Sequence, residues 1–150
     1  HKPSTDSFQY TAKALGLTVL IAAPGPLLMA LFGWDLGRAD TLGRFPQALA
    51  QVLLWLAPVY FHLRLFLILC KPGGLALEHF RWPRSGVDAL RRKLIVLMWT
   101  FLPAALVTGV IISLEPDTSG GEWGRVSLAL MTASVALFLY SLFKRDRSAL

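Results

Sequence analysis

The sequence predicts an all-α integral membrane protein with four transmembrane helices. Its hydrophobic content is 55% and its mean hydropathy is +0.55, which is more apolar than a soluble domain of 150 residues tolerates. It also contains several apolar runs of the roughly 20 residues that a helix needs to cross a bilayer. No run competes with these by showing the apolar–polar alternation of a strand.

Residues 1–150 are expected to form a single transmembrane module, because no internal repeat and no low-complexity linker divides them. The chain opens at His1 without a Met and without the layout of a signal peptide, so we expect a fragment of a longer protein. The single cysteine, Cys70, excludes an internal disulfide.

The first predicted span covers residues 14–34 and carries no charge. Pro24 and Pro26 lie near its centre, and each proline removes a backbone donor. The carbonyls of Leu20 and Ala22 lose their helical partners, which predicts a kink or a broken helix at this point.

The second predicted span, residues 48–69, contains Pro58, His62 and Arg64. A charge at the bilayer centre costs about 2.5–3.5 kcal/mol on insertion scales, whereas each Leu, Ile, Val or Phe returns about 0.3–0.6. More than ten such residues stand in this stretch, so it remains a span. Arg64 also lies about two turns from Cys70, which lets its guanidinium snorkel toward the interface.

The third and fourth predicted spans cover residues 94–114 and 126–143. The third is uncharged and contains Pro103, which predicts a further bend. The fourth is close to the lower length limit of a membrane-spanning helix.

Small residues recur at every fourth position on both of these spans. They are Ala105, Gly109 and Ser113 on the third span and Ala129 and Ala133 on the fourth. This spacing lets helices approach closely, so we expect both faces to pack against neighbours within the module.

The distribution of Lys and Arg predicts the topology. Eleven of the 15 basic residues fall on the side of the two termini and of the loop 70–93, whereas Arg38, Arg44 and Arg125 fall on the other side. By the positive-inside rule, both termini and the loop 70–93 are cytoplasmic.

The stretch "CKPGGLALEHFRWP", residues 70–83, interrupts the apolar sequence between the second and third spans. Its Pro-Gly-Gly segment is typical of a helix end, and the basic and aromatic residues that follow favour a segment lying along the interface. The same composition also fits a short polar loop with no role beyond topology. The predicted lipid contacts are Arg81, Trp82, Arg84, Arg91, Arg92 and Lys93.

This stretch resembles a cytoplasmic loop in the N-terminal membrane region of the large, multi-helix, MscK-like members of the MscS mechanosensitive channel superfamily. The positions that carry the resemblance are Cys70, Pro72, Gly74, Leu75, Ala76, His79, Phe80, Trp82 and Pro83. The resemblance is specific over about 14 residues and looser over the remaining spans.

The resemblance implies an inner-membrane channel of bacteria that acts in osmotic stress, with membrane lipids and the other helices and pore domain of the parent chain as partners. It also implies a homo-oligomer, a heptamer if the family pattern holds. The sequence shows no pore helix ridged with glycine and alanine and no soluble β-domain after it. The expected role is therefore that of peripheral tension-sensing helices upstream of the pore, with bends at Pro24, Pro26, Pro58 and Pro103.

Two alternatives stay open. A segment of a membrane transporter would gather polar residues with His62 and Arg64 around a shared cavity, since ionisable residues inside the membrane are candidate functional sites. A membrane scaffold would pack its small-residue faces on a partner chain.

Other function classes find no support in the sequence. It contains no phosphate-binding glycine loop, paired carboxylates or nucleophile with a positioned base, so we expect no enzyme. His1, His62 and His79 lack the spacing of a metal or haem site, so we expect no cofactor. The net charge of +6 belongs to the loops, so we expect no nucleic-acid partner.

Overall fold

The computed structural model describes residues 5–38, 43–72, 74, 82–114 and 121–144. The regular secondary structure of these residues is entirely helical, which confirms the all-α prediction for the described part of the chain. The helices are α1 (Thr5–Ala22), α2 (Pro24–Arg38), α3 (Arg44–Leu69), α5 (Arg84–Leu114) and α6 (Gly121–Phe143).

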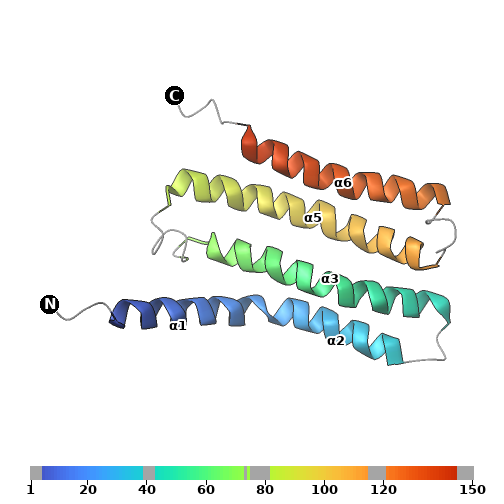
Figure 1. Cartoon of the computed structure of the whole chain (residues 1–150), viewed down its shortest axis with the longest axis horizontal. Helices are drawn as coiled ribbons and strands as arrows, with labels where there is room; N and C mark the ends of the chain where they lie inside the picture. Colours follow the sequence, from blue (N-terminus) through green and yellow to red (C-terminus); the bar gives the residue numbers. More distant parts are fainter. Residues whose placement is uncertain (1–4, 39–42, 73, 75–81, 115–120, 145–150) are drawn as a thin grey trace.

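The helices form a flat, open row (Figure 1). The bent pair α1 and α2 lies at one edge, followed by α3, α5 and α6, and successive members run in opposite directions. The main contacts join neighbours in this row, namely α2 with α3, α3 with α5, and α5 with α6. Because the row is one helix thick, both of its broad faces remain uncovered by the described residues.

A small apolar core lies where α3 meets α5. Val52, Leu56 and Ala105 are buried there. Partly buried side chains from α2, α5 and α6 pack against them, namely Met29, Phe101, Leu102, Leu106, Val110 and Met131. This small core therefore connects neighbouring helices across the row, but it does not form an enclosed interior.

The first predicted span is broken at its prolines. Helix α1 ends at Ala22, α2 begins at Pro24, and the two segments meet at an angle of 43°. The backbone N–H of Ala23 still donates to the carbonyl of Val19 at 3.0 Å, so the chain continues across the break without a loop. Three helices, α3, α5 and α6, are each long and apolar enough to cross a membrane, and counting α1 and α2 together as one bent span gives up to four.

Helix α5 begins earlier than the sequence predicts. The predicted loop extended to residue 93, but the helix starts at Arg84, so residues 84–93 belong to α5. The carbonyl of Pro83 accepts hydrogen bonds from the N–H groups of Gly86 and Val87, at 3.0 and 3.2 Å, and so opens the helix. Val87 is buried, and this apolar contact favours helix in a stretch whose charges alone indicated a loop.

The two predicted small-residue faces behave differently. On α5, Ala105 is buried, and a Cβ added at Gly109 would lie 2.9 Å from the methyl carbons of Val52 on α3. On α6, both Ala129 and Ala133 are exposed, so the prediction that they pack within the module is wrong for the described residues.

Helix α6 meets α5 through a different stripe. Its buried and half-buried positions recur at spacings of three and four residues, and they are Gly124, Ser127, Met131, Ser134, Phe138 and Ser141. This period matches the seam of two helices that pack nearly antiparallel. The small residues of the seam alternate with larger ones, which is why a strict small-residue repeat did not reveal it.

Candidate functional site

The broad faces of the row are covered with large apolar side chains. Leu20, Trp55, Trp99 and Leu137 are 68%, 74%, 72% and 67% exposed, and many other Leu, Val, Ile and Phe residues are more than half exposed. Contiguous apolar surface of this extent indicates contact with a membrane or with further protein. In the apolar stretches of α3, α5 and α6, at most 17% of the residues are buried inside the chain. The chain therefore presents its apolar residues outward.

The loop motif forms a tight end to α3. The N–H of Cys70 donates to the carbonyl of Phe66 at 3.0 Å, and the N–H of Gly74 donates to the carbonyl of Lys71 at 2.7 Å. A Cβ added at Gly74 would lie 2.7 Å from the carbonyl oxygens of Leu69 and Lys71, so the turn requires glycine. Pro72 is exposed on this turn.

The rest of the motif is described only at its end. Trp82 and Pro83 are exposed just before α5, and Trp82 is 52% accessible. Arg81, His79 and Phe80 lie outside the described residues.

Cys70 connects the end of α3 to the start of α5. Its side chain is buried with Val87, and Leu90 packs against both. Burial raises the pKa of the Cys70 thiol above its ordinary value, and the nearby positive charge of Arg91 opposes this shift. The contact ties the two helices together at the elbow, the turn between α3 and α5, beside the Pro-Gly-Gly segment that the sequence predicted to end a helix.

Four of the basic residues predicted as lipid contacts, Arg84, Arg91, Arg92 and Lys93, lie along the first turns of α5. Arg84 and Arg92 are exposed, whereas Arg91 and Lys93 are half-buried. Because α5 is continuous here, these charges are held on a rigid helix instead of a loop.

Arg64 lies against the break between α1 and α2. A Cβ added at Gly25 would overlap the Arg64 guanidinium and would lie 3.1 Å from the Tyr60 hydroxyl oxygen. Arg64 Nη1 also donates a long hydrogen bond of 3.4 Å to that hydroxyl. The absent side chain of Gly25 thus makes room for the charged group of α3 beside the helix break.

His62 has a partner of its own on α3. Its Nδ1–H donates to the carbonyl of Pro58 at 2.7 Å, one turn earlier. Pro58 and Pro103 lie inside the uninterrupted helices α3 and α5, whereas Pro24 begins α2 and Pro26 is buried in its first turn.

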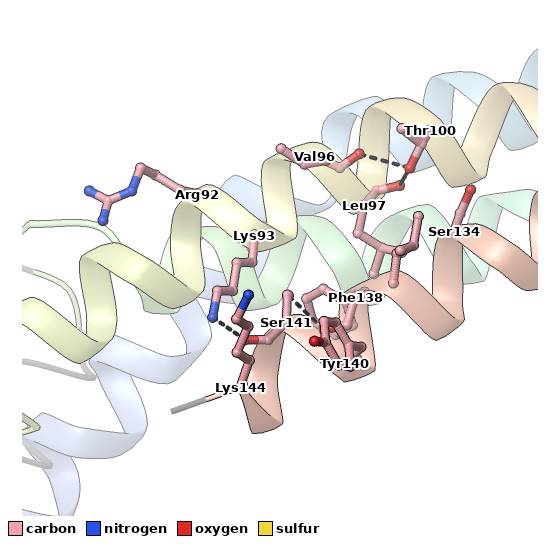
Figure 2. A pocket seen from close by; sticks show the side chains of 11 residues that line it. Arg92, Lys93, Val96, Leu97, Thr100, Ser134, Phe138, Tyr140, Ser141 and Lys144 are labelled. Atoms are coloured by element: carbon pink, nitrogen blue, oxygen red, sulfur yellow. Dashed lines mark hydrogen bonds between the residues drawn. The ribbon is translucent and has the colours of Figure 1, made fainter. Parts of the chain in front are cut away.

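A groove of about 530 Å³ runs between α5 and α6, and it was not predicted from the sequence. Figure 2 shows Lys93 and Lys144 beside each other at one end, with Arg92 projecting from the same end of α5. The Nζ of Lys93 donates to the carbonyl of Ser141 on α6. The ammonium group of Lys144 lies 5.8 Å from the centre of the Tyr140 ring.

The remainder of the groove is mainly apolar. Val96, Leu97, Leu137 and Phe138 line it below the basic end. The hydroxyl of Thr100, at the far end, donates to carbonyls of its own helix at 3.0 and 3.3 Å, so its polar group is already satisfied (Figure 2). The groove is therefore cationic at one end and mainly apolar along the rest of its length.

The described residues include no cluster of side chains that could serve as metal ligands. No group of three or more His, Cys, Asp or Glu side chains is arranged to hold a metal ion within these ranges. The surface of the described residues is mainly apolar, with basic side chains near the ends of the helices.

The known proteins that this chain resembles are membrane channels, which agrees with its exposed apolar surface. The chain is 26% identical over 145 residues to the miniconductance mechanosensitive channel MscM of Escherichia coli (strain K12). The alignment covers 95% of this chain and 13% of that channel, so the chain spans only a small part of its relative's length. No solved structure matches the chain significantly. Over residues 1–150 the sequence matches the family described as "Mechanosensitive ion channel inner membrane domain 1", and the chain belongs to that family.

Proposed function

We propose that this segment of an inner-membrane mechanosensitive channel acts in tension sensing and does not include the pore helix. Its membership of the channel's inner membrane domain family places it among the transmembrane parts of such proteins. The observation that carries the proposal is the open, one-helix-thick row, which leaves two apolar faces available to lipid. A peripheral sensor needs such contact, whereas a pore helix must pack around a permeation path.

The proposed arrangement has four spans, with α1 and α2 together crossing the bilayer once. Both ends of residues 1–150 and the loop before α5 then lie on the cytoplasmic side, in agreement with the excess of Lys and Arg there. The basic and aromatic residues Arg81, Trp82, Arg84, Arg91, Arg92 and Lys93 anchor this side to lipid headgroups.

The proposed mechanism is a tilt of the bent and long helices when tension thins the bilayer. Helix α5 has 31 residues and is roughly 46 Å long, so its tilt must respond to the thickness of a hydrocarbon core of about 30 Å. Pro24, Pro26, Pro58 and Pro103 are the positions at which the helices bend. The bias on the channel is limited to the difference in lipid interaction free energy between its two states.

The pore, in this proposal, lies in the remaining part of the parent chain. The related channel is far longer than the aligned segment, which covers 13% of it. The single transmembrane module formed by residues 1–150 assembles with the other helices and pore domain of its own chain, and the parent is a homo-oligomer, proposed as a heptamer.

Patch-clamp recording of the full-length parent in liposomes under graded suction tests the proposal. The variant carries Arg81→Ala, Trp82→Ala and Arg84→Ala. We expect a shifted tension threshold at unchanged unitary conductance, because the anchoring side chains change the tilt equilibrium and leave the permeation path intact. A changed conductance at an unchanged threshold would contradict the proposal and place the segment at the pore.

A matched triple variant at the opposite membrane surface serves as the control. Trp34→Ala, Arg38→Ala and Arg44→Ala remove the same side-chain types, including the Arg38 guanidinium that lies 5.2 Å from the Trp34 ring. A smaller threshold shift in this variant assigns sensing to the elbow before α5, and an equal shift assigns it to the interfacial residues generally. Loss of activity from His62→Ala with Arg64→Ala, while the elbow tolerates change, would favour the transporter alternative.

A further inference from the structure

The groove between α5 and α6 combines two properties that an individual phospholipid would recognise. Its basic end carries Arg92, Lys93 and Lys144, and none of the described residues that line it is acidic. Its volume of about 530 Å³ falls in the range of roughly 300–1,000 Å³ that is typical of small-molecule sites. An anionic group is therefore favoured at one end only.

The length of the groove matches one leaflet of a bilayer. From Lys93 to Thr100 the groove follows α5 for about 10 Å, and from Ser134 to Lys144 it follows α6 for about 15 Å, at a rise of roughly 1.5 Å per residue. Half of a hydrocarbon core of about 30 Å is roughly 15 Å. A chain that enters at the basic end would thus reach the mid-plane near the far end of the groove.

At the far end of the groove, the side-chain hydroxyls of Ser134 and Thr100 both have hydrogen-bond acceptors. The hydroxyl of Ser134 donates to the carbonyl of Leu130 at 2.8 Å, as Thr100 does to its own helix. Hydrocarbon can therefore contact these residues without stranding a donor. Tyr140 is exposed beside the basic end, at the depth where an amphipathic ring is favoured.

We propose that this groove binds one anionic phospholipid, with its phosphate at Lys93 and Lys144 and one acyl chain between Val96, Leu97, Leu137 and Phe138. The site goes beyond the tension-sensing proposal, because it requires only that α5 and α6 lie in a bilayer. The charge of the basic end is what argues for an anionic lipid over an additional apolar helix as the occupant.

Photo-crosslinking in the full-length parent tests this site directly. Benzoylphenylalanine replaces Val96, which lines the groove and is 62% exposed, or Val107, which is 50% exposed on α5 outside it. The protein is reconstituted into phosphatidylcholine vesicles that contain a minority of phosphatidylglycerol in both leaflets, and the lipid adducts are identified by mass spectrometry. Because both leaflets are alike, the result does not depend on the orientation of the chain.

We expect the adduct at position 96 to be enriched in phosphatidylglycerol at least about threefold over its share of the vesicle, given the attraction of two or three basic groups. The adduct at position 107 should follow the vesicle composition. Lys93→Gln with Lys144→Gln should abolish the enrichment, and Lys93→Arg with Lys144→Arg should retain it.

Three outcomes would overturn the proposal. A peptide adduct at position 96 would show that another part of the protein covers the groove. A lipid adduct at position 96 with the vesicle composition would show a surface without preference for anionic lipid. Enrichment that survives Lys93→Gln with Lys144→Gln would place the anionic group elsewhere.

Discussion

The absence of a side chain at Gly25 leaves space for the guanidinium of Arg64. The Arg64 guanidinium occupies the position of a Cβ at residue 25, and Tyr60 lies 3.1 Å from the same position. This arrangement explains how an arginine inside a predicted span is accommodated: its guanidinium lies beside the break between α1 and α2, where the two helices meet at 43°. Arg64 is thus held in place by its contacts with Tyr60 and with the chain at Gly25.

Substituting Gly25→Ala should destabilise the folded chain by about 1–3 kcal/mol, because the methyl group forces Arg64 and Tyr60 to move. In an Arg64→Leu background the same substitution should cost less, giving a coupling of about 0.5–3 kcal/mol in a double-mutant cycle. The measurement is the midpoint of detergent-induced unfolding followed by circular dichroism. Gly16→Ala is the matched control, since a Cβ there meets nothing within 4 Å; equal losses at both positions would refute the proposed crowding.

The Cys70 thiol should react slowly with a maleimide in the folded chain. Burial favours the neutral thiol and raises its pKa, while the reaction requires the thiolate. The stabilisation that accompanies this shift is present below the ordinary pKa of the thiol and is lost as the pH rises past it. Labelling rates between pH 6 and 10, against an exposed Ser85→Cys in a Cys70→Ala background, measure the effect.

The Val87→Ala substitution should accelerate labelling of Cys70, because Val87 forms the wall that buries the thiol. A rate that matches the exposed cysteine at every pH in the unsubstituted chain would show that Cys70 is not buried in the membrane-embedded protein.

The helices differ in how well their sequences specify their contacts. The Pro-rich break of the first span and the apolar length of α3, α5 and α6 follow from local composition, so the sequence predicted them. The start of α5 was mispredicted because the burial of Val87 against Cys70 depends on a tertiary contact. The exposed Ala129 and Ala133 were mispredicted because spacing identifies a small-residue face without identifying the neighbour that meets it.

The site divides in the same way. The basic and aromatic residues before and within α5 could be identified from the sequence, because the positive-inside rule depends on residue type alone. The groove between α5 and α6 and the pairing of Arg64 with Gly25 require that distant segments lie side by side. The residues that form the groove, and the Arg64–Gly25 pair, are far apart in the sequence, so local patterns do not reveal either arrangement.

Gly109→Val should loosen the contact between α3 and α5, because Val52 already lies 2.9 Å from the position of a Cβ. We expect a loss of about 1–3 kcal/mol, from overpacking, in the free energy of detergent-induced unfolding. Ala133→Val, on the exposed side of α6, should change this value by less than about 0.5 kcal/mol. The reverse order of the two losses would contradict the packing of the row.

At the scale of the whole molecule, the proposed topology makes a direct prediction for accessibility. In a Cys70→Ala background of the parent protein, Lys71→Cys and Ser85→Cys should be labelled by an impermeant maleimide only after the cells are opened. Gly43→Cys and Glu122→Cys, at the opposite ends of the helices, should be labelled in intact spheroplasts. Labelling of all four positions from outside, or the inverse pattern, would refute the proposed sidedness.

The flat row also bears on how the protein is made. Each main contact joins helices that follow one another along the chain, from α2 with α3 to α5 with α6. Local contacts of this kind form quickly, since little chain entropy is lost in closing the short segments between them. Each newly synthesised helix therefore finds its partner already in the bilayer, and assembly of the row can follow the order of translation.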